Sequence, residues 1–159
     1  MSTAHHTPCS SAGALDLGED ALQLERQVCF ALVVASRSVL AIYRPLLEPL
    51  GLTHPQYLVM LALWGETPLS VSRIGSLLQL DSPTLSPLLK RLQAAGLITR
   101  TRSDEDERQV LIDLTGEGRA LREEALAIPP AVVEKLGMEL SELEALHTAL
   151  SRVIAATGG

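Results

Sequence analysis

One stretch of this sequence, residues 82–91, carries the side chains best suited to contact nucleic acid. We expect a helix here, with an apolar face of leucines at Leu85, Leu88, Leu89 and Leu92. The residues left for the other side are Thr84, Ser86, Pro87, Lys90, Arg91 and Ala94, with Ser82 at the start of the helix. Short side chains permit close approach to a major groove, hydroxyls and cations bind phosphates, and donors read base edges.

A hairpin with a polar tip is expected directly after this helix. Leu97–Arg102 and Gln109–Leu114 are rich in β-forming residues, and Ser103–Glu107 separates them. In a winged helix-turn-helix, the second helix enters a major groove and the hairpin tip, or wing, reaches a neighbouring groove or the backbone. Arg108 and Gln109 therefore join the DNA-binding candidates.

Lys90 with Arg91, and an expected pair of Asp81 and Arg108, each also have a simpler interpretation. Taken alone, Lys90 and Arg91 fit the solvated face of a surface helix better, and only the linked hairpin favours DNA contact. Asp81 at the helix entry and Arg108 on the returning strand are expected to pair and to fix the wing against the helix. The alternative is an exposed pair that contributes little energy.

The basic charge of the chain is local. The formal net charge is -6, yet residues 70–102 hold five basic side chains and only Asp81 as an acid, which makes this stretch +4 and the remainder -10. The overall acidity therefore does not exclude a nucleic-acid-binding surface.

Helix start and stop signals place the remaining elements. A first long helix is expected from Leu22 to Tyr43, stopped by Pro45, and its apolar stripe is long enough to serve a partner subunit. Four further helices are expected: from Thr53, with Pro55 in the first turn, to Gly65; from Ser70 to Leu78; from Ser82, followed by Pro83, to Gly96; and from Thr115 to about Ala127, where Pro129–Pro130 break the helix. A last helix is expected to begin at a capping box of Ser141 and Glu144.

These elements predict a mainly α fold with a small β-hairpin wing. Residues 1–18 are expected to be a disordered tail, and 19–159 a single chain. Within it the winged-helix DNA-binding part covers about 53–115, and a dimer forms through helices at about 20–45 and 116–157. Aromatic residues are only 3% of the sequence and hydrophobic residues 47%, which favours helices over a sheet sandwich.

Several functional classes are disfavoured. The two cysteines are too few for a disulfide framework, and the start of the chain lacks a secretory pattern, so a cytoplasmic location is expected. The apolar segment Cys29–Tyr43 contains Arg37 and falls short of the roughly 20 residues of a membrane span. No phosphate loop, metal-ligand cluster or catalytic constellation is recognisable, and His5, His6 and Cys9 have no metal-site spacing. We therefore expect no enzyme, no metal and no cofactor.

The stretch from Thr67 to Arg119 strongly resembles the winged-helix core of the MarR family of transcriptional regulators. The most specific part is DER-x-V-x-I-x-LT at Asp106–Thr115. Upstream, QVCFALVVASRSVLAIYRPLL and GLTHPQYLVMLALW resemble the organic-hydroperoxide-sensing, OhrR-type branch of that family. The similarity runs from about Gln27 to Pro129.

This resemblance implies a homodimeric repressor that binds an inverted-repeat operator in double-stranded DNA and responds to organic hydroperoxides. It implies that Cys29 is the peroxide-reactive thiol and that Asp81 and Arg108 form the salt bridge between helix and wing. In that branch two tyrosines of the partner subunit bind the cysteine; Tyr43 matches the first, and His54 stands at the second. The C-terminal half holds no cysteine, which points to one-cysteine oxidation, with a small thiol or Cys9 as the resolving group.

Geometry limits how such a redox site can assemble. Cys29 and Tyr43 are fourteen residues apart, roughly 21 Å along one straight helix, so they meet only across a dimer. A thiolate that attacks peroxide becomes a sulfenic acid, and donors such as Tyr43 and His54 stabilise the thiolate. Because a histidine can be cationic near neutral pH, His54 would make sensing pH-dependent.

Two other functions remain open at this stage. One is a regulator that binds a phenolic or lipid ligand non-covalently, with Cys29 inert. The other is a thiol peroxidase, which needs a resolving thiol for repeated turnover, and Cys9 is the available candidate. Replacing Cys29 by serine separates the first alternative from peroxide sensing, and stoichiometric peroxide consumption would exclude the second.

Overall fold

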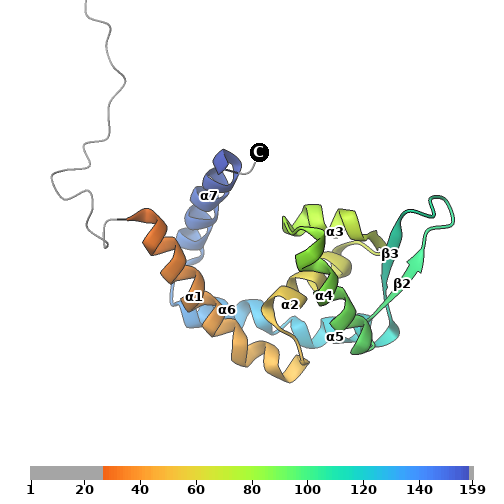
Figure 1. Cartoon of the computed structure of the whole chain (residues 1–159). Coiled ribbons are helices and arrows are strands. Elements are labelled where there is room, and N and C mark those ends of the chain that lie inside the picture. Colours follow the sequence, from red (N-terminus) through yellow and green to blue (C-terminus); the bar gives the residue numbers. More distant parts are fainter. Residues whose placement is uncertain (1–26, 158–159) are drawn as a thin grey trace, which may run out of the picture. The chain divides into compact units, whose positions relative to one another are not determined.

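The computed structural model describes residues 27–157 (Figure 1). The chain divides into two compact parts, residues 1–37 and 38–159, and each is described by itself. The expected tail at residues 1–18, with Cys9, lies outside the described residues.

The first helix, α1, spans Val28–Leu47 and is followed by the short 3-10 helix η2, Glu48–Leu50. The expectation that Pro45 stops the helix was wrong, since Pro45 lies inside its last turn. A proline there removes only the donor for the carbonyl of Ala41, so the helix can end two residues later. Gly51 ends η2 with a φ of 67°, a conformation that glycine adopts without strain.

Three helices follow, and two of them have the caps expected from their sequences. Helix α2 spans His54–Gly65, α3 spans Val71–Leu78 and α4 spans Ser82–Ala94. The Ser70 hydroxyl accepts a hydrogen bond from the Arg73 N–H and caps α3, as predicted. At α4 the cap is Asp81 instead of Ser82, because the Asp81 carboxylate accepts from the Thr84 N–H.

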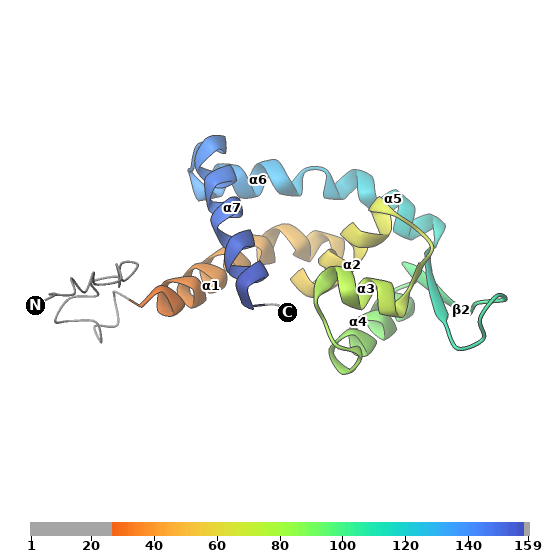
Figure 2. The same cartoon turned by 90° about the horizontal axis from the view of Figure 1, so that it is seen from above.

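The wing is a hairpin of β2, Ile98–Arg102, and β3, Val110–Leu114, as the sequence predicted. Figure 2 shows the hairpin extending past α3 and α4. Its register pairs Arg100 with Ile112. A third strand, β1 at Leu69–Ser70, pairs antiparallel with β3 and was not predicted, because two residues are too short to show a period-2 pattern.

The C-terminal part consists of α5, Gly116–Ala125, α6, Ile128–Leu136, and α7, Leu140–Thr157. Pro129 and Pro130 do not merely break a helix, since they lie in the first turn of α6, where their missing donors cost nothing. The capping box predicted at Ser141 and Glu144 was also wrong. The helix starts one residue earlier, and the Glu142 carboxylate accepts from the Glu139 N–H.

The hydrophobic core lies within residues 38–159, between α2, α4, α5 and the sheet. The largest fully buried side chains include Met60, Leu63, Ile74, Leu89, Leu92 and Ile112. By contrast, Leu47 is the one buried residue of α1, and α7 has none among its described residues. The winged-helix part therefore has a core of its own, whereas α1 and α7 present apolar side chains that remain uncovered in one chain.

One segment of 23 residues, Val28–Leu50, is long and apolar enough to cross a membrane by length and composition alone, and an 18-residue window within it has a mean hydropathy of 1.5. The sequence-based argument that the apolar stretch is too short was therefore wrong about its length. A helix that packs against a second copy of a soluble protein has the same composition, so length alone does not decide between the two.

Gly118 offers a test of this fold. A Cβ at this buried position of α5 would lie 2.1 Å from the Leu97 carbonyl oxygen, whereas a Cβ at the exposed Gly116 meets nothing within 4 Å. We expect Gly118→Ala to lower the free energy of unfolding by about 1–3 kcal/mol through overpacking. Gly116→Ala is the matched control and should change it by less than about 0.5 kcal/mol. Equal urea midpoints for both variants would contradict the close approach of α5 to the start of β2.

Candidate functional site

Helix α4 separates its apolar and polar faces as the sequence predicted. Leu85, Leu88, Leu89 and Leu92 are the buried residues of the helix. On the outward side Ser82, Thr84, Pro87, Lys90 and Arg91 are exposed and Ser86 is partly so. Pro87 lies inside the helix, so the carbonyl of Pro83 lacks its helical donor. The result is a small, hydroxylic and basic surface free of neighbouring elements.

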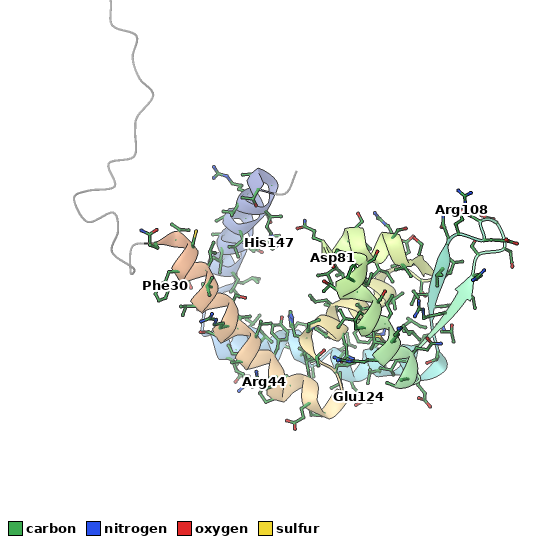
Figure 3. The ribbon with its side chains drawn as sticks, viewed as in Figure 1. Phe30, Arg44, Asp81, Arg108, Glu124 and His147 are labelled. Carbon is green, nitrogen blue, oxygen red and sulfur yellow. The ribbon has the colours of Figure 1, made fainter. Side chains whose placement is uncertain are left out.

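The tip of the wing, residues 103–109, is held by its own polar groups. The Ser103 hydroxyl accepts from the N–H groups of Glu105 and Asp106, each at 3.3 Å. The Asp106 carboxylate accepts from the Arg108 N–H at 3.0 Å and from the Gln109 side chain at 3.4 Å. These bonds shape the loop and leave the Arg108 side chain exposed at the tip (Figure 3).

The ion pair expected between Asp81 and Arg108 is not formed. Figure 3 shows the two side chains apart, Asp81 at the start of α4 and Arg108 at the wing tip. The Asp81 carboxylate already accepts a hydrogen bond from the Thr84 N–H at 2.9 Å. The pKa of Asp81 is lowered by hydrogen bonding to Thr84, through its side chain first and its N–H second. The ion pair does not form because the N-terminus of α4 offers the Asp81 carboxylate a nearer hydrogen-bond donor than the wing does.

A different polar cluster fixes the base of the wing. The Asp113 carboxylate on β3 accepts from the Thr67 hydroxyl at 2.8 Å and from the Arg119 guanidinium of α5 at 3.0 Å. Arg119 also donates to the Leu114 carbonyl. The Thr67 hydrogen bond is the largest cause of a lowered Asp113 pKa. We call this group the wing-base clasp, and sequence reasoning missed it because its members are up to 52 residues apart.

Two further hydrogen bonds connect α5 to the winged-helix core. The Thr115 hydroxyl caps α5 by accepting from the Gly118 N–H and donates to the Gly96 carbonyl. The Trp64 indole N–H of α2 donates to the Gly118 carbonyl at 2.8 Å. Through these bonds the start of α5 is tied to α2, to the end of α4 and to the wing.

Cys29 lies in the first turn of α1 and is an exposed, free cysteine. It belongs to the part that ends at Arg37, whereas Tyr43 and His54 belong to the other part. Of the three residues predicted for redox sensing, the structure thus brings Tyr43 and His54 together within residues 38–159.

Tyr43 and His54 are in direct contact. Their ring centroids are 4.7 Å apart in an edge-on arrangement, and the ring centroid of Tyr57 lies 6.0 Å from that of Tyr43. His54 is the first residue of α2. The start of this helix is fixed by the side-chain oxygen of Gln56, which accepts from the Thr53 N–H at 2.8 Å and from the Thr53 hydroxyl at 3.0 Å. Burial lowers the pKa of His54. The imidazole therefore favours its neutral form near pH 7, contrary to the cation considered from sequence.

A cavity of about 670 Å³ opens beside His54. Its lining is mainly apolar and comes from the end of α1, from η2 and from the start of α2: Leu40, Arg44, Leu47, Glu48, Gly51, Leu52, Thr53, His54 and Pro55. This volume is in the range of small-molecule sites. Among the described residues, no group of three or more His, Cys, Asp or Glu side chains could hold a metal ion.

Comparison with known proteins places this geometry in context. Residues 41–125 match the family model described as the transcriptional regulator SarA/Rot. The chain is 47% identical over 135 residues to the organic hydroperoxide resistance transcriptional regulator of Bacillus subtilis, covering 82% of this chain and 92% of that protein. It also resembles the solved structure of reduced AbfR bound to DNA, with a TM-score of 0.72 and 33% sequence identity. The match covers 87% of this chain and 96% of the AbfR chain. The apo form of MarR from E. coli, at 21% identity and a TM-score of 0.66, shares the fold.

The wing-base clasp predicts a pH-dependent stability. Because the folded-state pKa of Asp113 is lowered from 3.8, the ionised carboxylate stabilises the fold above this value and the stabilisation is lost as the pH falls through the folded pKa. We expect Asp113→Asn to cost about 1 kcal/mol of unfolding free energy at neutral pH and much less near pH 3. Asp104→Asn at the exposed wing tip is the control. Urea unfolding at both pH values measures the difference, and an equal loss at both would argue against a role for the charge.

Proposed function

Because the chain belongs to the MarR family of winged-helix transcriptional regulators and, within it, to the organic-hydroperoxide-sensing branch, we propose that it is a homodimeric repressor that releases its operator when Cys29 is oxidised. The DNA-binding role rests on one observation above all. The outward face of α4 gathers hydroxylic and basic side chains, Ser82, Thr84, Lys90 and Arg91, next to an exposed wing.

In this proposal α4 enters the major groove of double-stranded DNA. Thr84, Ser86 and Lys90 contact phosphates and base edges, together with Ser82, Pro87 and Arg91, while Arg108 and Gln109 contact the neighbouring groove or backbone. The wing-base clasp and the Trp64 hydrogen bond support this geometry, because they hold the wing and α5 at a defined angle to α2.

A second copy of the chain is required by the uncovered apolar residues. The exposed large hydrophobic side chains include Val28, Phe30, Val33, Val34 and Leu40 on α1, and Leu140, Leu146, Val153 and Ile154 on α7. Burial between two chains is an ordinary use of exposed apolar patches on helices. We therefore assign α1 and α7, with α5 and α6, to dimerisation, and the protein to the cytoplasm.

The signal is an organic hydroperoxide. The Cys29 sulfur attacks the outer peroxide oxygen, the O–O bond breaks, the cysteine becomes a sulfenic acid and the peroxide becomes an alcohol. Cys29 lies on a helix used for dimerisation, so added bulk and polarity there shift the two α4 helices relative to each other. A small thiol or Cys9 then resolves the sulfenic acid. One equivalent of peroxide is consumed per cysteine, which is signalling and not enzymatic turnover.

A non-covalent ligand regulator is the second candidate. The cavity of about 670 Å³ beside His54 favours it, because a phenolic or lipid molecule of ordinary size fits this volume. In that case Cys29 is inert and the response survives its replacement.

The deciding measurement is operator binding by fluorescence anisotropy. An inverted-repeat duplex from the promoter of the protein's own gene is titrated with native protein and Cys29→Ser, before and after one equivalent of cumene hydroperoxide. We expect oxidation to weaken binding by native protein by about 10- to 100-fold, in the range of allosteric couplings, and to leave Cys29→Ser unchanged. An equal response in both proteins would exclude Cys29 as the sensor, and more than one peroxide consumed per cysteine would indicate peroxidase activity.

The DNA-binding surface is tested separately with reduced protein. Lys90→Ala should weaken binding to specific and non-specific duplexes alike and lower the slope of log K against log salt by about 1 for each phosphate that the lysine neutralises in the native complex. Lys135→Ala, an exposed lysine on α6, removes the same charge elsewhere and should leave the slope unchanged. Identical slopes for Lys90→Ala and native protein would remove Lys90 from the interface.

A further inference from the structure

The cavity beside His54 has one polar group whose chemistry is unused. Among the described residues, no hydrogen bond or ion pair reaches the imidazole nitrogens of His54, although the ring lines the cavity. The ring is held at an edge-on contact with Tyr43, 4.7 Å between centroids. A fixed imidazole with an available nitrogen at the edge of a cavity is suited to proton transfer.

The surroundings of His54 favour a neutral ring. The titratable and charged groups around it are Tyr43 and Arg44 on α1, Glu48 on η2 and Tyr57 on α2. Arg44 and Glu48 carry opposite charges, and the cause of the lowered His54 pKa is burial. Near pH 7 the imidazole is therefore a proton acceptor, which a tyrosine at the same position would not be, since a phenol keeps its proton until about pH 10.

We propose that His54 is a catalytic residue of thiol oxidation, which takes the proton of Cys29 of the partner subunit and returns it to the alcohol formed from the peroxide. This inference rests on the proposed function. The organic group of the peroxide occupies the cavity, against Leu40, Leu47 and Pro55, and its reacting oxygens lie at the His54 edge.

The step balances without a further reactant. The imidazole nitrogen of His54 accepts the thiol proton while the sulfur attacks the outer oxygen of the hydroperoxide. An S–O bond forms and the O–O bond breaks, so that sulfur is oxidised to a sulfenic acid that keeps the outer oxygen and its hydrogen. The inner oxygen leaves as an alkoxide and takes the proton back from the imidazolium. His54 ends neutral and ready for the same step after the thiol is restored.

The role differs from that of a hydrogen-bond donor in its pH dependence. A donor supports a thiolate that has already formed, and reaction then follows the titration of the thiol towards alkaline pH. An acceptor makes the rate follow its own titration. Because the pKa of His54 lies below the usual 6.5, the rate constant should reach its plateau on the acid side of neutrality.

The test is the second-order rate constant of thiol loss with cumene hydroperoxide, measured on the full-length dimer from about pH 5 to about pH 9. The variants are His54→Gln, which hydrogen-bonds but accepts no proton in this range, and His54→Tyr, which supplies a phenol donor. His147→Gln, on the exposed face of α7, is the matched control. Circular dichroism and operator binding of the reduced proteins establish that each variant is folded.

We expect native protein and His147→Gln to show a rate midpoint below pH 6.5. His54→Gln should lose this midpoint and react about 10-fold or more slowly at pH 7, and His54→Tyr should lose the midpoint even if its rate recovers. After complete oxidation all four should release DNA alike, because His54 changes the rate and not the product. A folded His54→Gln that keeps the native rate and midpoint overturns the inference alone. A native Cys29 that does not react with peroxide overturns the proposed function with it.

Discussion

Burial of one face of α4 is the constraint on which the rest of the arrangement depends. Four leucines of this helix are buried, and transfer of each from water contributes about 1.5–3 kcal/mol. The rotation of the helix about its own axis is therefore not free. Because the leucines must face the core, the hydroxyl and basic side chains must face water, and packing thereby exposes the surface that contacts DNA in our proposal.

The second constraint is the attachment of the wing and of α5 to that core. Asp113 sits between Thr67 before β1 and Arg119 on α5, and the Gly118 carbonyl receives the Trp64 indole N–H from α2. Each bond is modest by itself, and surface ion pairs in particular contribute little. Together they connect the wing, which contacts DNA in our proposal, to α5, which we assign to dimerisation, and we expect a displacement of one to displace the other.

The incompleteness of a single chain is itself informative. Helices α1 and α7 have long apolar faces with almost no buried residue, while the winged-helix part has a full core. Such a division is expected when one half of a protein folds on itself and the other half folds on a second copy. In our proposal α1 joins two copies, so a thiol on this helix is well placed to alter the spacing of the two α4 helices.

The sequence by itself determined the elements whose causes are local. The leucine spacing of α4, the caps at Thr53 and Ser70, and the hairpin after Gly96 are properties of a few neighbouring residues, and the structure has them where they were predicted. The MarR-type pattern added the family, which the comparisons support along most of the chain. The roles of single site residues stay predictions, since their partners, DNA and a second subunit, lie outside one chain.

Tertiary structure alone decided the contacts between residues far apart. It replaced the expected pair of Asp81 and Arg108 by a helix cap at Asp81 and a clasp at Asp113, because a carboxylate takes the nearest correctly oriented donor and sequence does not give distances. It also placed His54 against Tyr43 beside a cavity and partly buried it. Burial sets the charge of an imidazole near pH 7, and burial is a property of the folded chain.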